Sequence, residues 1–252
     1  MRTQDTVDQS ALCETVATAC QVMAECGLVE HVLGHISARV SENELLVRCR
    51  GRLESGLAYT TSDDIRLLAM DGTGDTGAWT APNELAIHTE VMRARPDVSA
   101  VVHAHPPAVV ALSLLDVPLR PIYGAYDIPG ALLARDGVPV WPRSALITSS
   151  ALGAAMAGAL GDRPVVVLRG HGLVSAAAGP ADLAVRQAVL QAAAVNTLAR
   201  TTLSVLQAGG VPRPISDDDL RALPDLGGGF TVDTMWRHLV RRAADALRST
   251  KP

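Results

Sequence analysis

An apolar run that ends in His103-Ala104-His105 constrains the fold of this chain more than any other feature. Residues 98–105 read Val-Ser-Ala-Val-Val-His-Ala-His, and two prolines follow them. The pattern predicts a buried β-strand that ends at Pro106. Because side chains alternate between the two faces of a strand, His103 and His105 point to the same face, about 6.5–7 Å apart along the strand axis.

A third histidine, His171, completes a candidate metal site. It follows a second predicted strand, residues 165–168, and lies in a turn flanked by glycines. Three imidazoles with one open position are typical of a catalytic rather than a structural metal site. The alternative is that two of these histidines belong to the core and one to a loop, because hydrogen-bonded core histidines are common.

Glu84 is the candidate carboxylate of the same site. Pro82 suits the first turn of a helix and places Glu84 near the helix N-terminus. Glu84 could bind the metal or act as a general acid or base, since a nearby ion and burial shift the pKa of a carboxyl in opposite directions. The alternative role is a favourable interaction with the helix dipole. His88, four residues later, is expected to pack or to form a hydrogen bond rather than bind metal.

These motifs, in their order along the chain, resemble those of the class II aldolase/adducin-like family. The resemblance covers roughly residues 10–205 and implies a three-layer α/β/α sandwich with a mostly antiparallel central sheet. It also implies a homotetramer with active sites at subunit boundaries, with His103, His105 and His171 as metal ligands and Glu84 as a catalytic carboxylate that also coordinates. The matching segments are residues 34–39 (GHISAR), 60–65 (TTSDDI), 82–84 (PNE), 95–105 (RPDVSAVVHAH) and 170–174 (GHGLV).

Departures from the sugar-phosphate aldolase pattern bear on the substrate. Those aldolases usually carry Gly-Asn, Thr-Gly and Ser-Ser where this chain has residues 34–35 (Gly-His), 62–63 (Ser-Asp) and 82–83 (Pro-Asn). The changes remove hydrogen-bond donors for a phosphate, and Asp63 and Asp64 add negative charge. A phosphorylated sugar is therefore disfavoured.

Several other residues are candidates for holding a carboxylate instead. His35 and Arg39 offer suitable donors, and Arg50 and Arg52 add two guanidinium groups in the loop before Tyr59. The alternative for the two loop arginines is a solvated hairpin. The family motifs add three further candidate substrate-binding residues, Gly34, Ser62 and Asn83.

The pattern resembles the decarboxylase-type branch of the family, which acts on hydroxylated aromatic or heteroaromatic carboxylic acids. Decarboxylation and aldol cleavage both leave an electron pair that an adjacent oxygen, polarised by a metal, must absorb. We therefore expect a metal-dependent carbon–carbon lyase, and a decarboxylase is the first choice. In that reaction Glu84 or a water at the ion delivers the proton, and His35, as a catalytic residue, orients the leaving or retained carboxylate together with an arginine. Three alternatives remain: an aldolase or epimerase on a small carbonyl or sugar substrate, an iron-dependent oxygenase, and a non-enzymatic assembly module. The expected cofactor is a divalent zinc, manganese or iron ion.

Two tyrosines share the Pro- and Gly-rich loop of residues 121–129. The chain has only three tyrosines and one phenylalanine, so Tyr123 and Tyr126 in one loop are candidate pocket residues. Tyr126 is the candidate proton donor and Tyr123 a candidate stacking wall. The alternative is that both anchor the loop by packing. The family resemblance implies that such a tyrosine can serve the site of a neighbouring subunit.

Length and composition agree with a single domain and with a small-molecule substrate. The chain has 252 residues, of which 48% are hydrophobic and 19% charged, enough for one substantial core. A formal net charge of −4 with scattered basic residues argues against nucleic acid or membrane partners. The four cysteines lack Cys-x-x-Cys spacing, and the opening residues, with Gln4 and Asp5, lack a secretion signal. We expect reduced thiols and a cytoplasmic location.

The catalytic domain is expected to span residues 1–210. Residues 211–252 are expected to be a helical extension of it that forms an interface or a lid, with docking on its own chain as the alternative. The expected helices are 8–27, 149–160, 180–207 and 232–247, with a strand at 44–49 and a turn-rich connector at 212–229.

Overall fold

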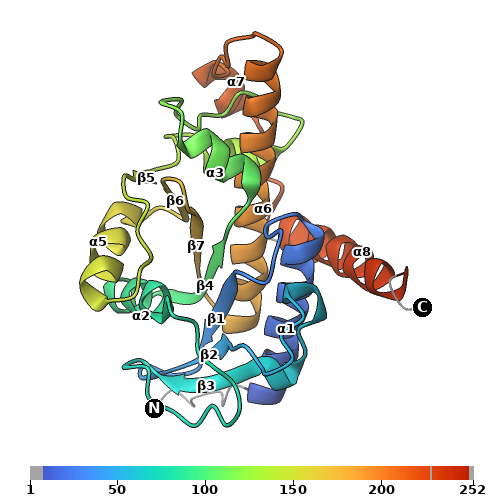
Figure 1. The fold of residues 1–252 in the computed structure, drawn as a ribbon. Coiled ribbons are helices and arrows are strands. Elements are labelled where there is room, and N and C mark those ends of the chain that lie inside the picture. Colours follow the sequence, from blue (N-terminus) through green and yellow to red (C-terminus); the bar gives the residue numbers. More distant parts are fainter. Residues whose placement is uncertain (1–7, 228, 250–252) are drawn as a thin grey trace, which may run out of the picture.

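The computed structural model describes residues 8–227 and 229–249 and shows one sheet with helices on both sides (Figure 1). Gln4 and Asp5 lie outside the described residues. The strands are β1 (His35–Arg39), β2 (Glu44–Arg48), β3 (Ile65–Ala69), β4 (Val98–Ala104), β5 (Val140–Trp141), β6 (Val165–Leu168) and β7 (Gly172–Ala178). The helices are α1 (Gln9–Glu25), α2 (Leu85–Ala94), α3 (Pro107–Ser113), α4 (Ile128–Leu133), α5 (Ser150–Leu160), α6 (Ala181–Gln207), α7 (Asp217–Ala222) and α8 (Met235–Ser249), with short turns η1 (Leu57–Tyr59), η2 (Ser62–Asp64) and η3 (Gly229–Thr234).

The seven strands form a mostly antiparallel sheet in the order β3-β2-β1-β4-β7-β6-β5. Only the pair of β5 and β6 is parallel among the described strands. Helices α1 and α6 cover one face, and α2 and α5 cover the other (Figure 1). The predicted three-layer α/β/α sandwich is therefore confirmed.

The alternation of side chains along β1 and β4 divides the core into two parts. Ile36 and Val102 belong to the hydrophobic cluster under α1 and α6, and Val101 belongs to the cluster under α2 and α5. His35 and His103 are register partners on these strands. Because a strand alternates with a period of two, both histidines face the α2 side, the same side as Val101.

Helix ends follow the capping residues that the sequence offers. Ser149 caps α5 by accepting a hydrogen bond from the Leu152 amide, and Gly161 ends the helix with φ 57°. Pro180 stands at the N-cap of α6, as expected. The helix expected to begin at Pro82 begins later, because Pro82 to Glu84 form a turn and α2 begins at Leu85. The carboxylate of Glu84 thereby turns away from the helix and toward the sheet.

The C-terminal segment contains more helix than the sequence predicts. The expected connector at 212–229 includes α7, which Ser216 caps. Helix α8 contacts α1, with Trp236 and Ala243 buried and an ion pair between Arg242 and Glu25. Its far end extends beyond the sandwich (Figure 1). Across the described ranges, no helix has the length and apolar character needed to cross a membrane.

Candidate metal centre

The ends of two strands and the turn that follows one of them bring three histidines together. His103 lies near the end of β4, and His105 follows it directly. His171 lies in the turn between β6 and β7, where its amide donates a hydrogen bond to the carbonyl of Leu168. Because β4 pairs with β7 through Ala104, this turn is adjacent to the end of β4.

Gly172 allows the two segments to approach each other this closely. A Cβ atom at this position would lie 2.2 Å from the carbonyl oxygen of Ala104 and 3.0 Å from Cδ2 of His105. No side chain fits at such distances without a shift of the backbone that carries His105. Strand β7 was not predicted, although the glycine beside His171 is part of the motif that resembled the family.

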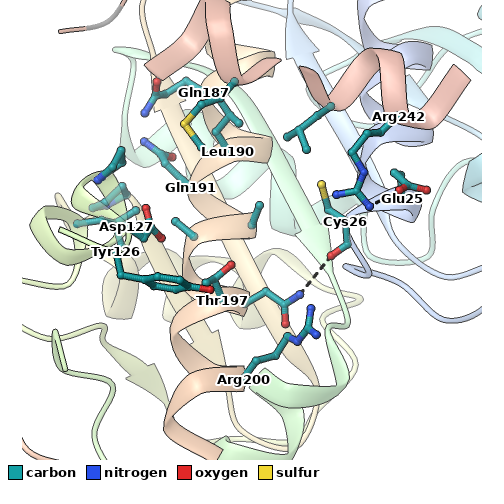
Figure 2. A pocket seen from close by; sticks show the side chains of 18 residues that line it. Glu25, Cys26, Tyr126, Asp127, Gln187, Leu190, Gln191, Thr197, Arg200 and Arg242 are labelled. Atoms are coloured by element: carbon teal, nitrogen blue, oxygen red, sulfur yellow. Dashed lines mark hydrogen bonds and ion pairs between the residues drawn. The ribbon is translucent and has the colours of Figure 1, made fainter. Parts of the chain in front are cut away.

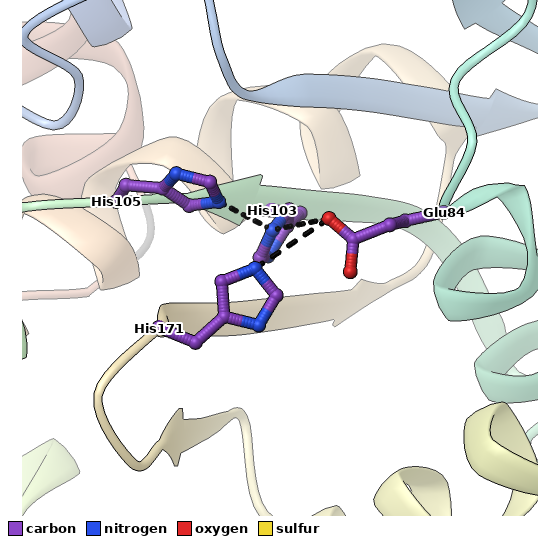
Figure 3. A group of neighbouring side chains, drawn as sticks. All are labelled: Glu84, His103, His105 and His171. Atoms are coloured by element: carbon purple, nitrogen blue, oxygen red, sulfur yellow. Dashed lines mark hydrogen bonds and ion pairs between the residues drawn. The ribbon is translucent and has the colours of Figure 1, made fainter. Parts of the chain in front are cut away.

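Four ligand atoms converge on one point (Figure 3). The cluster consists of Glu84, His103, His105 and His171, whose ligand atoms all lie within 4.8 Å of one another. Oε2 of Glu84 lies 3.4 Å from Nε2 of His103 and 3.5 Å from Nε2 of His171. Nε2 of His105 lies 2.8 Å from Nε2 of His103. The structure therefore brings together all four residues that the sequence assigned to the metal.

The hydrogen bonds around the cluster fit a divalent cation. Nδ1 of His103 lies 3.0 Å from the carbonyl oxygen of Leu173, which can only accept, so Nδ1 carries the proton and Nε2 a lone pair. That lone pair faces the carboxylate of Glu84, and two electron-rich atoms at 3.4 Å repel unless a cation lies near both. Nδ1 of His171 is buried without a partner among the described residues. Three imidazoles and one carboxylate suit zinc, manganese and iron(II) alike.

The charges within the cluster favour an ionised carboxylate and neutral imidazoles. Burial opposes ionisation of Glu84, but the adjacent His103 and His171 and the hydrogen bond from the Ile147 amide (2.8 Å) outweigh it and hold its pKa well below the usual range. Burial, followed by the charges of His103 and His171, lowers the pKa of His105 to about 3. Metal ligands require these protonation states.

A recess of about 90 Å³ opens beside the cluster. Four predicted substrate residues line it, and so does Arg48, which was not predicted. Arg48 is 3% exposed and pairs with Glu54 at 2.5 Å, and its Nε has no hydrogen-bond partner among the described residues. The lining residues are Val32, Leu33, Gly34, His35, Arg48, Arg50, Pro82, Asn83, Glu84, His105 and Leu146. The alternation along residues 48–50 could have indicated Arg48, since it shares a face with Arg50.

Besides Tyr123, three predicted substrate residues do not line this recess. Arg39 lies at the opposite end of β1 from His35, and its guanidinium donates hydrogen bonds to the carbonyls of Val98 (2.9 Å) and Met92 (2.7 Å). It therefore joins β1 to β4 and to the end of α2. Arg52 lines a separate cavity of about 310 Å³, and Ser62 is exposed in η2.

The two tyrosines lie together, but not at the cluster. Tyr126 is 76% exposed and lines a groove of about 720 Å³ between the α4 region, α6 and α8 (Figure 2). No described residue lines both this groove and the recess. Tyr123 packs against the core, its ring centroid 5.3 Å from that of Tyr126, and burial beside Asp127 raises its pKa.

His88 forms hydrogen bonds, as predicted, and joins two side chains of β1. Its Nε2 lies 2.6 Å from Nδ1 of His35, and its Nδ1 lies 2.7 Å from Oγ of Ser37. Burial, and after it the charge of His103, lowers the pKa of His88 to about 3. Burial, with the charges of His88 and His103, also lowers the pKa of His35 well below its ordinary value.

Comparison with known families and curated proteins identifies similar sequences. The Class II Aldolase and Adducin N-terminal domain family matches residues 14–203. The chain is 54% identical over 238 residues to the 3,4-dihydroxyphthalate decarboxylase of Arthrobacter keyseri, covering 92% of this chain and 94% of that protein. It is 53% identical over 235 residues to the protein of the same name from Rhodococcus jostii (strain RHA1), covering 91% of this chain and 94% of that protein. Identity to the L-fuculose phosphate aldolase of Escherichia coli (strain K12) is 25% over 215 residues, covering 85% and 93%.

Solved structures share the fold at lower sequence identity. An aldolase II superfamily protein from Pseudomonas syringae superposes with a TM-score of 0.76 at 21% identity, covering 96% of each chain. The L-fuculose 1-phosphate aldolase from Glaciozyma antarctica PI12 gives a TM-score of 0.75 at 20% identity, covering 97% of this chain and 94% of that one. Both have the architecture described above.

Proposed function

The chain belongs to the Class II Aldolase and Adducin N-terminal domain family, and from this we infer a metal-dependent lyase that removes carbon dioxide from a hydroxylated aromatic carboxylic acid. The observation that carries the proposal is the recess, where Arg48 and Arg50 lie close to Glu84 and His105. A carboxylate-binding region thus adjoins a candidate metal site. The similarity to two 3,4-dihydroxyphthalate decarboxylases over most of the chain supports the same reaction.

We propose 3,4-dihydroxyphthalate as the substrate. This molecule carries two neighbouring carboxylates and two neighbouring hydroxyls on one ring, so it is an anion with several oxygens able to bind metal. The two guanidinium groups of Arg48 and Arg50 complement its charge, and planar guanidinium pairs well with carboxylate. We assign them to the carboxylate that remains on the ring, with Gly34 and Asn83 as further contacts.

His103, His105 and His171 would hold the metal ion, with Glu84 as a fourth ligand or as the acid–base group. When bound, the ion supplies a Lewis acid that polarises a substrate oxygen next to the bond that breaks. The Ile147 amide keeps the carboxylate of Glu84 aimed at the cluster. As the carbon–carbon bond breaks, carbon dioxide leaves and the electron pair stays on the ring. Glu84 then delivers to that ring carbon a proton that it took from a ring hydroxyl.

We further propose that the protein works as a homotetramer in which Tyr126 serves a neighbouring subunit. Tyr126 does not line the recess of its own chain and is exposed at a large groove, which supports this. Residues 211–252 would then contribute to the subunit interface, because α8 extends beyond the sandwich. The four free cysteines suit a cytoplasmic location.

Anaerobic incubation of the purified protein with 3,4-dihydroxyphthalate tests this function. We expect release of carbon dioxide and of the matching dihydroxybenzoate, with about one divalent ion per chain. The His103→Ala variant should lose both the ion and the activity, and His31→Ala, which removes an exposed histidine outside the cluster, should lose neither.

The same experiment separates the alternatives. A metal-loaded protein that releases no carbon dioxide would contradict decarboxylation. Cleavage of L-fuculose phosphate would then favour the aldolase, since a solved L-fuculose 1-phosphate aldolase shares the fold. Product that forms only when oxygen is admitted would favour an iron-dependent oxygenase.

A further inference from the structure

The roles proposed so far leave out His88, although it is a fully buried polar residue close to the site. Its exposed fraction is 0%, and it lies on α2 against the face of the sheet that carries the cluster. Both of its ring nitrogens lie within hydrogen-bond distance of a side chain of β1. A residue that only filled space here could be apolar, since burial of an imidazole costs free energy unless its nitrogens are bonded.

In the hydrogen-bonded series Ser37–His88–His35, a donor and an acceptor can be assigned to the bond between the two histidines. Val101 is opposite Ser37 in the register of β1 and β4, and its backbone acts to raise the pKa of His88, as a carbonyl near an imidazole N–H does. Since Nε2 of His88 faces His35, we assign the donating N–H to Nδ1, on the side of Ser37 and Val101. A neutral imidazole has one N–H, so Nε2 of His88 must then accept. Its partner at 2.6 Å is Nδ1 of His35, which therefore donates.

We propose that His88 is a positioning residue for His35: it holds the ring toward α2 and fixes the proton on Nδ1, so that Nε2 presents a lone pair to the recess. His35 lines that recess, and its ring centroid lies 5.0 Å from that of His103. Nε2 of His35 then accepts a hydrogen bond from a ring hydroxyl of the substrate. Our sequence interpretation had instead made His35 a donor to a carboxylate.

This inference rests on the proposed function, because a dihydroxylated ring supplies the donor that Nε2 needs. The two other groups assigned to the substrate's carboxylate, Arg48 and Arg50, are donors only. An acceptor at His35 completes the recess: the arginines bind the anionic part of the ring and His35 binds the hydroxyl part. The same lone pair repels a carboxylate. The substrate ring is therefore oriented with a hydroxyl, and not a carboxylate, at His35.

The tautomer of His35 can be measured without a substrate. Nitrogen NMR of the zinc-loaded protein, labelled at histidine, distinguishes a protonated ring nitrogen from a bare one, and zinc adds no unpaired electrons. We expect His35 to show a protonated Nδ1 and a bare Nε2, with its signals assigned by their loss in His35→Ala. In His88→Phe, which removes both contacts and keeps a ring, the signals of His35 should shift toward a tautomer mixture. A protonated Nε2 in the wild-type protein would overturn the proposal.

Kinetics test whether His88 acts through His35. We expect His88→Phe to retain one metal ion per chain and a KM within about threefold, and to lose about 10- to 100-fold in kcat, as is usual when the partner of a functional imidazole is removed. The double variant with His35→Ala should be no slower than His35→Ala alone. Additive losses in the double variant would contradict a role through His35.

Two further variants distinguish the loss of a hydrogen bond from misfolding. His88→Gln keeps a polar group near the position of Nε2 and should recover part of the lost kcat, whereas an effect of packing alone would not favour Gln over Phe. Thr89→Val, a buried substitution on the same helix, should change neither the tautomer nor kcat. If the wild-type protein releases no carbon dioxide while the tautomer is as expected, the proposed function fails and the role of His88 stands.

Discussion

His35 and His103 are register partners across β1 and β4, and their ring centroids lie 5.0 Å apart. One residue therefore lines the recess and the other belongs to the metal cluster, although both lie on the same face of two paired strands. A substrate seated against His35 would lie next to the proposed ligands of the ion. Geometry of this precision depends on strand register, because a slip by one residue would turn His103 to the opposite face.

The register at the end of β4 should be sensitive to one methyl group. We predict that Gly172→Ala reduces metal content and lowers the free energy of unfolding by about 1–3 kcal/mol, since its Cβ would lie 2.2 Å from the carbonyl oxygen of Ala104. Gly158→Ala is the matched control on α5, where a Cβ meets nothing within 4 Å and alanine favours helix by about 0.5–1 kcal/mol. Metal analysis and urea unfolding of both variants decide the matter. Full metal content in Gly172→Ala would contradict the prediction.

The grouping of the three histidines could be predicted from the sequence because its signals are local. The period of a strand places His103 and His105 on one face, and the glycines around His171 mark a turn at a strand end. Strand β7 was missed because it reads GLVSAAA, and alanine and serine carry little preference for strands. Its pairing with β4 is a tertiary effect that a short window of sequence does not contain.

The residues proposed to bind the substrate were harder to predict, because their positions also depend on tertiary packing. Arg39 and Arg50 look alike in sequence, yet Arg39 is bound to two backbone carbonyls and Arg50 lines the recess. His88 lies 53 residues from His35, and no local pattern links the two. Side chains of β1 and α2 meet only after the sheet has formed, so their hydrogen bonds follow from packing rather than from spacing.

The two arginines should therefore respond differently to substitution. We predict that Arg50→Met raises KM for 3,4-dihydroxyphthalate by roughly 10- to 100-fold, since a hydrogen bond to a charged group contributes about 1.5–3 kcal/mol. KM for 2,3-dihydroxybenzoate, which lacks the retained carboxylate, should change little. Arg39→Met should lower stability and leave KM for both acids unchanged. Steady-state kinetics with the two acids test this, and an equal rise for both would remove the proposed role of Arg50.

Stability should depend on pH through His88. Burial lowers its pKa in the folded protein to about 3 from 6.5. Below pH 6.5 the unfolded chain binds a proton that the folded protein does not, so stability is lost as pH falls from 6.5 toward 3 and is unaffected by this group above 6.5. We predict that His88→Phe loses about 2 kcal/mol less than the wild type between pH 6.5 and 5.

Urea unfolding of both proteins at pH 7.5, 6.5 and 5 measures this difference. A chelator should be present throughout, because a bound ion would add its own pH dependence. His35 and His105 also have lowered pKa values, and both residues remain in the variant. Parallel pH profiles for the two proteins would show that His88 titrates normally in the folded state.

The proposed role of Tyr126 in a neighbouring subunit predicts that two impaired variants recover activity when they are coexpressed. His103→Ala removes a proposed metal ligand and Tyr126→Phe removes a hydroxyl proposed to serve a neighbouring subunit's site, so each homotetramer should be impaired. If Tyr126 serves a neighbouring subunit, coexpression creates some sites with the ligands of one chain and the tyrosine of the other. Random assembly of equal amounts gives about a quarter of the sites intact, because a ring of identical contacts pairs the chains at random. Activity near that fraction supports a shared site. No recovery in hybrids confirmed by mass spectrometry would place Tyr126 within its own subunit's site, and full activity of Tyr126→Phe alone would place it outside the reaction.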